Sequence, residues 1–397
     1  MKADDMTIPL ALYVHVPWCV RKCPYCDFNS HEAGAALPER AYVDAVLDDL
    51  ARDLRWQPAL AGREICSVFI GGGTPSLFSA SAYERMFNGL RESLRFADDA
   101  EITLEANPGT VEQRKFRDYR ALGINRLSIG VQSFDAHHLQ ALGRIHGRAE
   151  ALRAADAART AGFDNFNLDL MHGLPLQTPE GALRDLEQAI ALQPAHLSWY
   201  QLTLEPNTVF YTQRPALPDD DTLADIEDAG FARLAAAGFM RYEISAFARP
   251  GMQCRHNRNY WEFGDYLALG AGAHGKVTQP DGRVLRYRKT RLPRDYLQAA
   301  SRIGVNTGNP YTSESATVDT AELPFEFMLN ALRLTAGVDA ALFTARTGLP
   351  AAAISDACAG LRARGLLQDE PGRLACTAAG LRFLNDVLDA FVAPDAD

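Results

Sequence analysis

Positive charge is in short supply in this chain. Its 397 residues include 40 Lys and Arg against 50 Asp and Glu, and the formal net charge is −10. This balance argues against a general nucleic-acid-binding protein, which needs a basic surface. The chain also lacks a run of 18 apolar residues and a charged-then-apolar leader. We therefore expect a cytoplasmic protein with no membrane span and no nucleic-acid partner.

Cysteine is sparse, but three of the cysteines are close together. The chain has seven cysteines, an odd number that fits a reducing compartment and no disulfide framework. Cys19, Cys23 and Cys26 have the spacing C-x3-C-x2-C. Three thiolates on a short loop can hold three irons of a [4Fe–4S] cluster and leave the fourth iron open. A zinc site completed by His15 or His31 is the alternative. The four other cysteines stand alone, which is typical of small buried hydrophobes, and they are Cys66, Cys254, Cys358 and Cys376.

Strand-like and helix-like segments alternate through the first 240 residues. This alternation predicts an α/β fold with a parallel sheet, open or closed into a barrel. The expected strands are Leu10–Val16, Ile65–Ile70, Glu101–Glu105, Arg126–Val131, Asn165–Met171 and His196–Leu202. The expected helices include Glu39–Leu54, Glu150–Ala161, Pro179–Leu192 and Asp221–Ala237.

The pattern changes twice after residue 240, so we expect three units: 1–240, 241–310 and 311–397. Residues 250–310 have no clear period and are predicted to be loops and short strands packed against the barrel. The last unit has the outline of a winged helix. Its expected elements are the helices Phe325–Leu334, Ala352–Arg364 and Leu381–Val392 and a two-stranded wing, Gly365–Thr377, turning at Glu370-Pro371-Gly372. Residues 311–397 have a net charge of −6, which favours a protein-contact or lid role over DNA binding.

Several polar and glycine-rich motifs fall at the carboxyl ends of the expected strands, where parallel sheets carry their chemistry. Each motif alone is commonly structural, but their shared position predicts a single site. They are the cysteine loop, Gly71-Gly72-Gly73-Thr74-Pro75, Glu105, Gln132, Arg144 and Asp169.

The cysteine spacing together with the glycine run resembles the radical S-adenosylmethionine (SAM) superfamily. The order of the rim motifs, from Tyr13 to Asp169, is similar to that of the anaerobic coproporphyrinogen III dehydrogenase family, over about residues 10 to 390. The resemblance implies a partial (β/α)6 barrel with a C-terminal winged-helix-like domain. It also implies a [4Fe–4S] cluster on Cys19, Cys23 and Cys26, whose open iron binds SAM.

The same resemblance assigns individual residues to cofactor binding. Tyr13, Gly72 and Glu105 match contacts to a first SAM molecule. The positions that match contacts to a second molecule are Tyr25, Gly73, Thr74, Gln132, Arg144, Asp169 and Thr203.

Three features depart from the dehydrogenase family. Phe28 stands where that family has a fourth cysteine, and the long segment before its cluster is missing here. The run His256-Asn257-Arg258-Asn259-Tyr260-Trp261 resembles the H-N-x-x-Y-W signature of the related HemW family of heme chaperones. An imidazole can take an axial position on iron, and aromatic rings can flank a macrocycle.

The heme prediction therefore names His256, Tyr260 and Trp261. Arg255 and Arg258 are available for the propionates. His274 and Cys254 are alternative axial ligands.

The resemblance implies a chaperone that binds heme and passes it to an acceptor protein, with an electron donor for the cluster. The alternative function is an oxygen-independent coproporphyrinogen III oxidase of porphyrin biosynthesis. A third hypothesis is another radical enzyme with an unknown substrate. The sequence leaves open whether the protein is an enzyme.

Overall fold

Six parallel strands form the centre of the molecule. The computed structural model describes residues 8–34, 36–301, 308–370 and 372–393. The strands lie side by side in chain order: β1 (Leu10–Val16), β4 (Glu64–Gly72), β5 (Arg95–Ala106), β6 (Arg126–Gln132), β7 (Phe166–His172) and β8 (His196–Gln201). The six predicted strands and the partial barrel are thus confirmed. Strand β5 begins six residues earlier than predicted, at Arg95.

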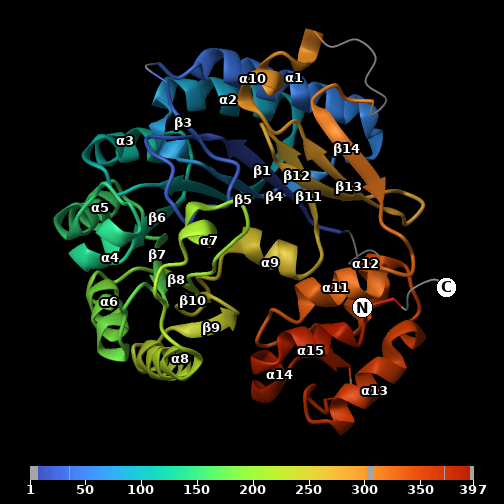
Figure 1. Cartoon of the computed structure of the whole chain (residues 1–397). Coiled ribbons are helices and arrows are strands. Elements are labelled where there is room, and N and C mark those ends of the chain that lie inside the picture. Colours follow the sequence, from blue (N-terminus) through green and yellow to red (C-terminus); the bar gives the residue numbers. More distant parts are fainter. Residues whose placement is uncertain (1–7, 35, 302–307, 371, 394–397) are drawn as a thin grey trace.

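Helices follow these strands and cover the outside of the sheet (Figure 1). They are α1 (Glu39–Trp56), α2 (Ala80–Ser93), α3 (Thr110–Ala121), α4 (Ala136–Ala141), α5 (Arg148–Thr160), α6 (Pro179–Ala191) and α8 (Asp220–Ala236). The short helix α7 (Val209–Gln213) lies instead against the cysteine loop, where the Phe210 amide donates to the Pro24 carbonyl at 3.0 Å. Local capping fixes several starts. The Ser79 hydroxyl accepts from the Ala82 amide before α2, and the Thr178 hydroxyl accepts from Gly181 before α6.

The sheet continues at both ends with other strands. Beyond β8 lie β10 (Ala246–Ala248) and then β9 (Met240–Glu243). Strand β10 is antiparallel to β8, and β9 is antiparallel to β10. Beyond β1 lie β11 (Asp265–Leu269), β12 (His274–Thr278), β13 (Val284–Lys289) and β14 (Thr312–Thr317), which complete a 12-stranded sheet. Strand β11 is parallel to β1, and the next three pairings are antiparallel. We call β11–β14 the extension.

The extension corrects one prediction. Residues 250–310 were expected to pack against the barrel, but their strands hydrogen-bond into its sheet. The same region contains two helices, α9 (Arg255–Trp261) and α10 (Pro293–Leu297).

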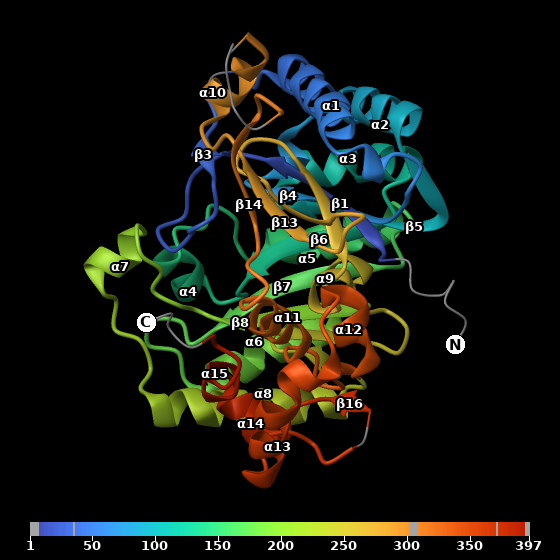
Figure 2. The same ribbon diagram turned by 90° about the vertical axis from the view of Figure 1, so that its right-hand side faces the viewer.

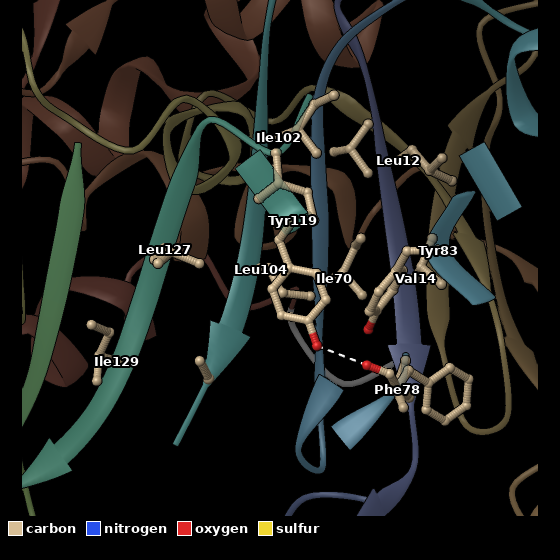
Figure 3. Packing of buried hydrophobic residues seen from close by; sticks show 14 of the residues in the cluster. Leu12, Val14, Ile70, Phe78, Tyr83, Ile102, Leu104, Tyr119, Leu127 and Ile129 are labelled. Carbon is tan, nitrogen blue, oxygen red and sulfur yellow. Dashed lines mark hydrogen bonds between the residues drawn. The ribbon is translucent and has the colours of Figure 1, made fainter. Parts of the chain in front are cut away.

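The main core lies between the parallel strands and their covering helices. Figure 3 shows Leu12 and Val14 of β1 beside Ile70 of β4 and Leu104 of β5. All four side chains are buried, as strands with both faces covered require. Tyr119 of α3 donates its hydroxyl to the Phe78 carbonyl at 2.7 Å (Figure 3), which satisfies a polar group within this core.

The C-terminal residues form a second core. Its elements are α11 (Leu323–Ala331), β15 (Val338–Asp339), α12 (Ala341–Thr347), α13 (Ser355–Ala363), β16 (Arg373–Leu374), α14 (Ala378–Arg382) and α15 (Leu384–Asp389). The predicted wing is a hairpin bridged at Leu367 and Cys376, and β16 pairs with β15; Pro371 at its turn lies outside the described residues. The last predicted helix is broken at Phe383.

This second core also buries residues from the rest of the chain. Phe263 packs edge-to-face on Phe327 of α11, with ring centroids 5.7 Å apart. Tyr242 and Val284 belong to the same cluster. Figure 2 shows the C-terminal helices packed beneath α9 and the extension. In the ranges described here, no helix combines the length and the apolar character that crossing a membrane requires.

Candidate functional site

The loop after β1 carries the three predicted cluster ligands. Cys19 lies in a two-residue strand, β2 (Trp18–Cys19), which pairs with β3 (His31–Glu32). The Cys26 amide donates to the Cys23 carbonyl at 3.2 Å and closes a turn between the other two ligands. All three side chains line one cavity of about 360 Å³, which we call the cluster cavity. The cysteine spacing and the strand ends therefore meet at one place, as predicted.

Burial favours the neutral thiol at two of the three predicted ligands. Burial raises the pKa of Cys19 and of Cys26. Because a metal binds the thiolate, a bound cluster has to supply the energy that deprotonates them.

The two histidines of the zinc alternative are both engaged elsewhere. His15 shares a hydrogen bond with the Tyr13 hydroxyl at 2.9 Å and another with the Asn29 carbonyl at 2.9 Å. His31 contacts the Asn29 side chain at 3.2 Å. Among the described residues, no three His, Cys, Asp or Glu side chains are grouped around a single ion position. A cluster does not require such grouping, because each cysteine binds a different iron.

Eight of the ten residues predicted to bind SAM line the cluster cavity. These eight are Tyr25, Gly72, Gly73, Thr74, Glu105, Gln132, Arg144 and Asp169. Seven of them come from the ends of β4, β5 and β6, from β7 and from the cysteine loop, so the parallel sheet brings them together as expected. Arg144 was expected at a strand end, but it lies in the loop between α4 and α5 and reaches the cavity from there.

The other two predicted residues lie elsewhere. Tyr13 lines a neighbouring larger cavity, and its hydroxyl is bonded to His15. Thr203 follows β8, is exposed, and is not part of the cluster-cavity lining.

The glycine turn after β4 is required by protein packing. Gly72 has φ of +114°, and a Cβ there would lie 2.5 Å from the His15 ring. A Cβ on Gly73 would lie 2.6 Å from the Trp18 carbonyl oxygen. Side chains at these positions would collide with the end of β1 and with the start of the cysteine loop, so the glycines let β4 pack against both.

Two acids in the cluster cavity have perturbed pKa values. Burial, and then the charge of Asp169, raises the pKa of Glu105 to about 8. The Gly72 amide donates to Glu105 at 3.0 Å and partly offsets this. Burial also raises the pKa of Asp169, although Ser128 and Asn167 donate hydrogen bonds to it. Buried acids that lack a close cation are typical of ligand sites.

A polar network connects three strand ends. Arg144 donates to the Gly130 carbonyl at 2.6 Å and to the Asn107 side chain at 2.8 Å, and Asn107 donates to Thr74 at 3.0 Å. A second Arg144 nitrogen lies 3.8 Å from the Cys23 sulfur. This network fixes the guanidinium beside the cysteine loop, where it can contact an anionic group.

Gln132 also lines the cluster cavity. It has φ of +69°, an uncommon value for a residue other than glycine. Its side-chain oxygen accepts from the Tyr200 hydroxyl at 2.7 Å.

The predicted heme motif forms α9, where a loop was expected. His256 is 2% exposed, and its ring stacks on Phe69 of β4 at a centroid distance of 5.2 Å. One ring nitrogen contacts the Ser67 hydroxyl at 3.2 Å, and the other has no hydrogen-bond partner among the described residues. Burial and then Arg126 lower the pKa of His256 to about 3. His256 is therefore packed into the interior between α9 and β4.

The other motif residues face in different directions. Tyr260 lines the larger cavity, whereas Trp261 lines the cluster cavity and has Arg333 over its ring at 4.5 Å. Arg255 pairs with Asp99, and Arg258 pairs with Glu262. The motif thus forms a wall between two cavities.

The larger cavity has a volume of about 940 Å³, and we call it the large cavity. Sequence analysis did not identify it. It lies between the cysteine loop and the extension, and its lining includes Tyr13, Phe28, Tyr260, Tyr266, His274, Arg288 and Arg291. Phe28 is 60% exposed and lines both cavities. The usable signal was His274, one of the alternative ligands, but the register that sets it opposite Arg288 could not be read from the chain.

The residues of the cluster cavity fit a cluster and a polar organic ligand. Three thiols face one space, and the same wall carries a guanidinium, an amide and two carboxyl groups. This donor set suits a cation–carboxylate ligand with ribose hydroxyls.

Comparison with known proteins agrees with this arrangement. The Radical SAM superfamily model matches residues 13–189, and the HemN C-terminal domain model matches residues 318–383. The heme chaperone HemW of Escherichia coli (strain K12) is 51% identical over 97% of this chain and 98% of its own length. The heme chaperone HemW of Haemophilus influenzae is 47% identical over 98% of this chain and 99% of its own length.

Among solved structures, coproporphyrinogen III oxidase (HemN) from Escherichia coli, a radical SAM enzyme, has a TM-score of 0.79. It is 25% identical, and the match covers 97% of this chain and 90% of that one. The predicted α/β fold, a radical SAM partial barrel followed by a C-terminal domain, is confirmed, and the C-terminal domain is of the HemN type. The chain belongs to the HemW family of the radical SAM superfamily.

Proposed function

We propose that this protein is a heme chaperone, which binds heme and transfers it to an acceptor protein. The observation that carries the proposal is the large cavity beside the cysteine loop. Its volume of about 940 Å³ lies in the range of ligand pockets, roughly 300–1,000 Å³. Its aromatic and arginine lining suits a flat apolar macrocycle with two carboxylates. The near full-length similarity to proteins named heme chaperones supports the same function.

Cys19, Cys23 and Cys26 would hold a [4Fe–4S] cluster, with exchangeable SAM at the open iron. Bound SAM supplies a source of a carbon radical when the cluster donates an electron. The chain's own residues would orient it: Glu105 toward the ribose and Arg144 toward a carboxylate. Gln132 and Asp169 border the same space.

Phe28 argues against the alternative function, that of an oxygen-independent coproporphyrinogen III oxidase. The similarity to HemN favours that function. Phe28, however, stands where the dehydrogenase family has a fourth cysteine, and it forms part of both cavity walls. We favour the chaperone because an aromatic side chain there adds to the macrocycle-binding surface.

The remaining proposals concern setting and partners. We infer three units, 1–240, 241–310 and 311–397, the last with an acidic surface suited to a protein contact. A cytoplasmic location, a place beside porphyrin biosynthesis, an electron donor for the cluster and a heme-accepting protein all follow from the chaperone function.

The test is anaerobic reconstitution of the full chain, followed by iron, sulfide and heme counts. We expect four irons and four sulfides per chain, and one bound heme that moves to apomyoglobin used as a probe acceptor. The cluster-free Cys19/Cys23/Cys26→Ala variant is the matched control for heme uptake. A protein that takes up no heme but decarboxylates coproporphyrinogen III under reducing conditions would replace the chaperone with the enzyme.

A further inference from the structure

Three imidazoles lie in or behind the wall of the large cavity, and they differ in availability. Both ring nitrogens of His15 are hydrogen-bonded, to Tyr13 and to Asn29. His256 is 2% exposed, does not line the cavity, and is stacked on Phe69. His274, at the start of β12, is exposed, lines the cavity, and makes no side-chain hydrogen bond within the described part of the chain.

We propose that heme is seated in the large cavity with the His274 imidazole as axial ligand and Arg288 and Arg291 on its propionates. The proposal rests on the heme-binding function proposed above and assigns its site. It separates the axial role from the H-N-x-x-Y-W motif, which forms the cavity wall.

Access decides between the two candidate ligands. Iron coordination needs a free ring nitrogen that points into open space. His256 has an unpartnered nitrogen, but its ring is enclosed by Phe69, Tyr13 and Tyr260. Ligation through His256 would require the ring to leave this stack and α9 to move away from β4. His274 needs no such movement.

The arginines lie where an imidazole-bound heme could reach them. His274 and Arg288 are directly opposite in the β12–β13 pairing. Arg288 forms an ion pair with Glu314, in which both side chains are more than half exposed. Such a pair is weak, so exchange of Glu314 for a propionate costs little. Arg291 has a 3.4 Å contact to the Asn29 side chain and keeps other donors free for a second carboxylate.

The motif tyrosine has a role in this arrangement. Tyr260 stands edge-to-face with Tyr266 at a centroid distance of 4.3 Å, and both line the cavity. Behind it, His256 packs edge-on to Tyr260 at 4.9 Å. His256 is therefore a positioning residue for the aromatic wall.

The experiment is a ferric heme titration of the anaerobic full-length protein, followed by Soret absorbance. His274→Ala should shift the Soret band and weaken binding at least about tenfold. Added imidazole should restore the wild-type spectrum by filling the vacated position. His137→Ala removes an exposed imidazole from α4, outside the large cavity, and is the matched control.

The arginine variants test the propionate contacts separately. Arg288→Gln and Arg291→Gln should weaken binding while leaving the Soret position unchanged. Circular dichroism of His274→Gln, a second variant at this site, checks that the fold is intact. Wild-type spectrum and affinity in both His274 variants, with loss of the axial signal in His256→Ala, would overturn the proposal. A wild-type protein that binds no heme would instead overturn the chaperone function.

Discussion

Acidic side chains have opposite surroundings in two regions of this molecule. In the cluster cavity, Glu105 and Asp169 are half-buried and form no ion pair within the described part of the chain, and the pKa of each is raised. Between α1 and the extension, Lys289 lies 2.6 Å from both Asp49 and Asp53, and all three side chains are fully buried. Burial alone would lower the pKa of Lys289, but the two carboxylates outweigh it and raise the pKa.

The difference distinguishes a ligand site from a structural ion-pair group. We call the group of Lys289, Asp49 and Asp53 the support. Paired charges satisfy each other and hold α1 against the extension, so they need no ligand. Unpaired acids at strand ends destabilise the empty protein and are retained where a ligand compensates them. Both the partners and the burial distinguish the two cases, because the ion-paired side chains are fully enclosed whereas Glu105 and Asp169 line a cavity.

The largest effect should come from the cysteine loop. Cys23→Ala should abolish the [4Fe–4S] absorption and electron paramagnetic resonance signals, because two thiolates cannot replace three. Cys66→Ala, in β4 outside the cluster-cavity lining, is the matched control and should keep the cluster. A wild-type cluster in Cys23→Ala would remove the basis for treating this cavity as a cofactor site.

The next effect should come from the support. Lys289→Met leaves Asp49 and Asp53 facing each other without their cation, and we expect a loss of about 3–5 kcal/mol in the free energy of unfolding. Arg283→Met breaks a surface ion pair with Asp281 and should cost about 1 kcal/mol or less. Urea denaturation measures both. Equal losses in the two variants would show that the buried cluster is no stronger than a surface pair.

The last effect concerns the dependence of stability on pH. Glu105 has a pKa of about 8 in the folded protein and an ordinary value of 4.5. The unfolded chain therefore binds fewer protons between these values, so this residue lowers stability as pH rises from 4.5 to 8. In the ligand-free protein, Glu105→Gln should become more stable relative to wild type across that range, by at most about 1.4 kcal/mol per pH unit. Thermal melting at pH 5, 6.5 and 8 measures it, and a constant difference would contradict the assignment.

The parallel half was predictable because its strands are buried on both faces. Segments such as Leu10–Val16 are nearly continuous apolar runs, and polar residues mark their ends. Because parallel strands end at one edge of the sheet, this pattern also predicts that the cysteine loop, Glu105 and Asp169 lie close together.

The extension could not be predicted from pattern alone. Lys276 and Lys289 interrupt β12 and β13, and lysines normally indicate solvent. Here both are buried, Lys276 beside Asp265 and Lys289 beside the acids of α1. The acids that pair with Lys289 lie far away in the sequence, so the local pattern around Lys289 does not indicate that it is buried. The large cavity was missed for the same reason, since the extension forms one of its sides.

The position of β1 has a consequence for the order of assembly. β1 pairs with β4 on one side and with β11 on the other, about 255 residues further along the chain. Asn29 of the cysteine loop also donates to the Ala271 carbonyl at 2.9 Å and to the Arg291 carbonyl at 2.8 Å. During synthesis, the cysteine loop near the N-terminus cannot complete these contacts until β11 and the residues that follow it have been made. Iron and sulfide can therefore enter a finished site only after about three-quarters of the protein has left the ribosome.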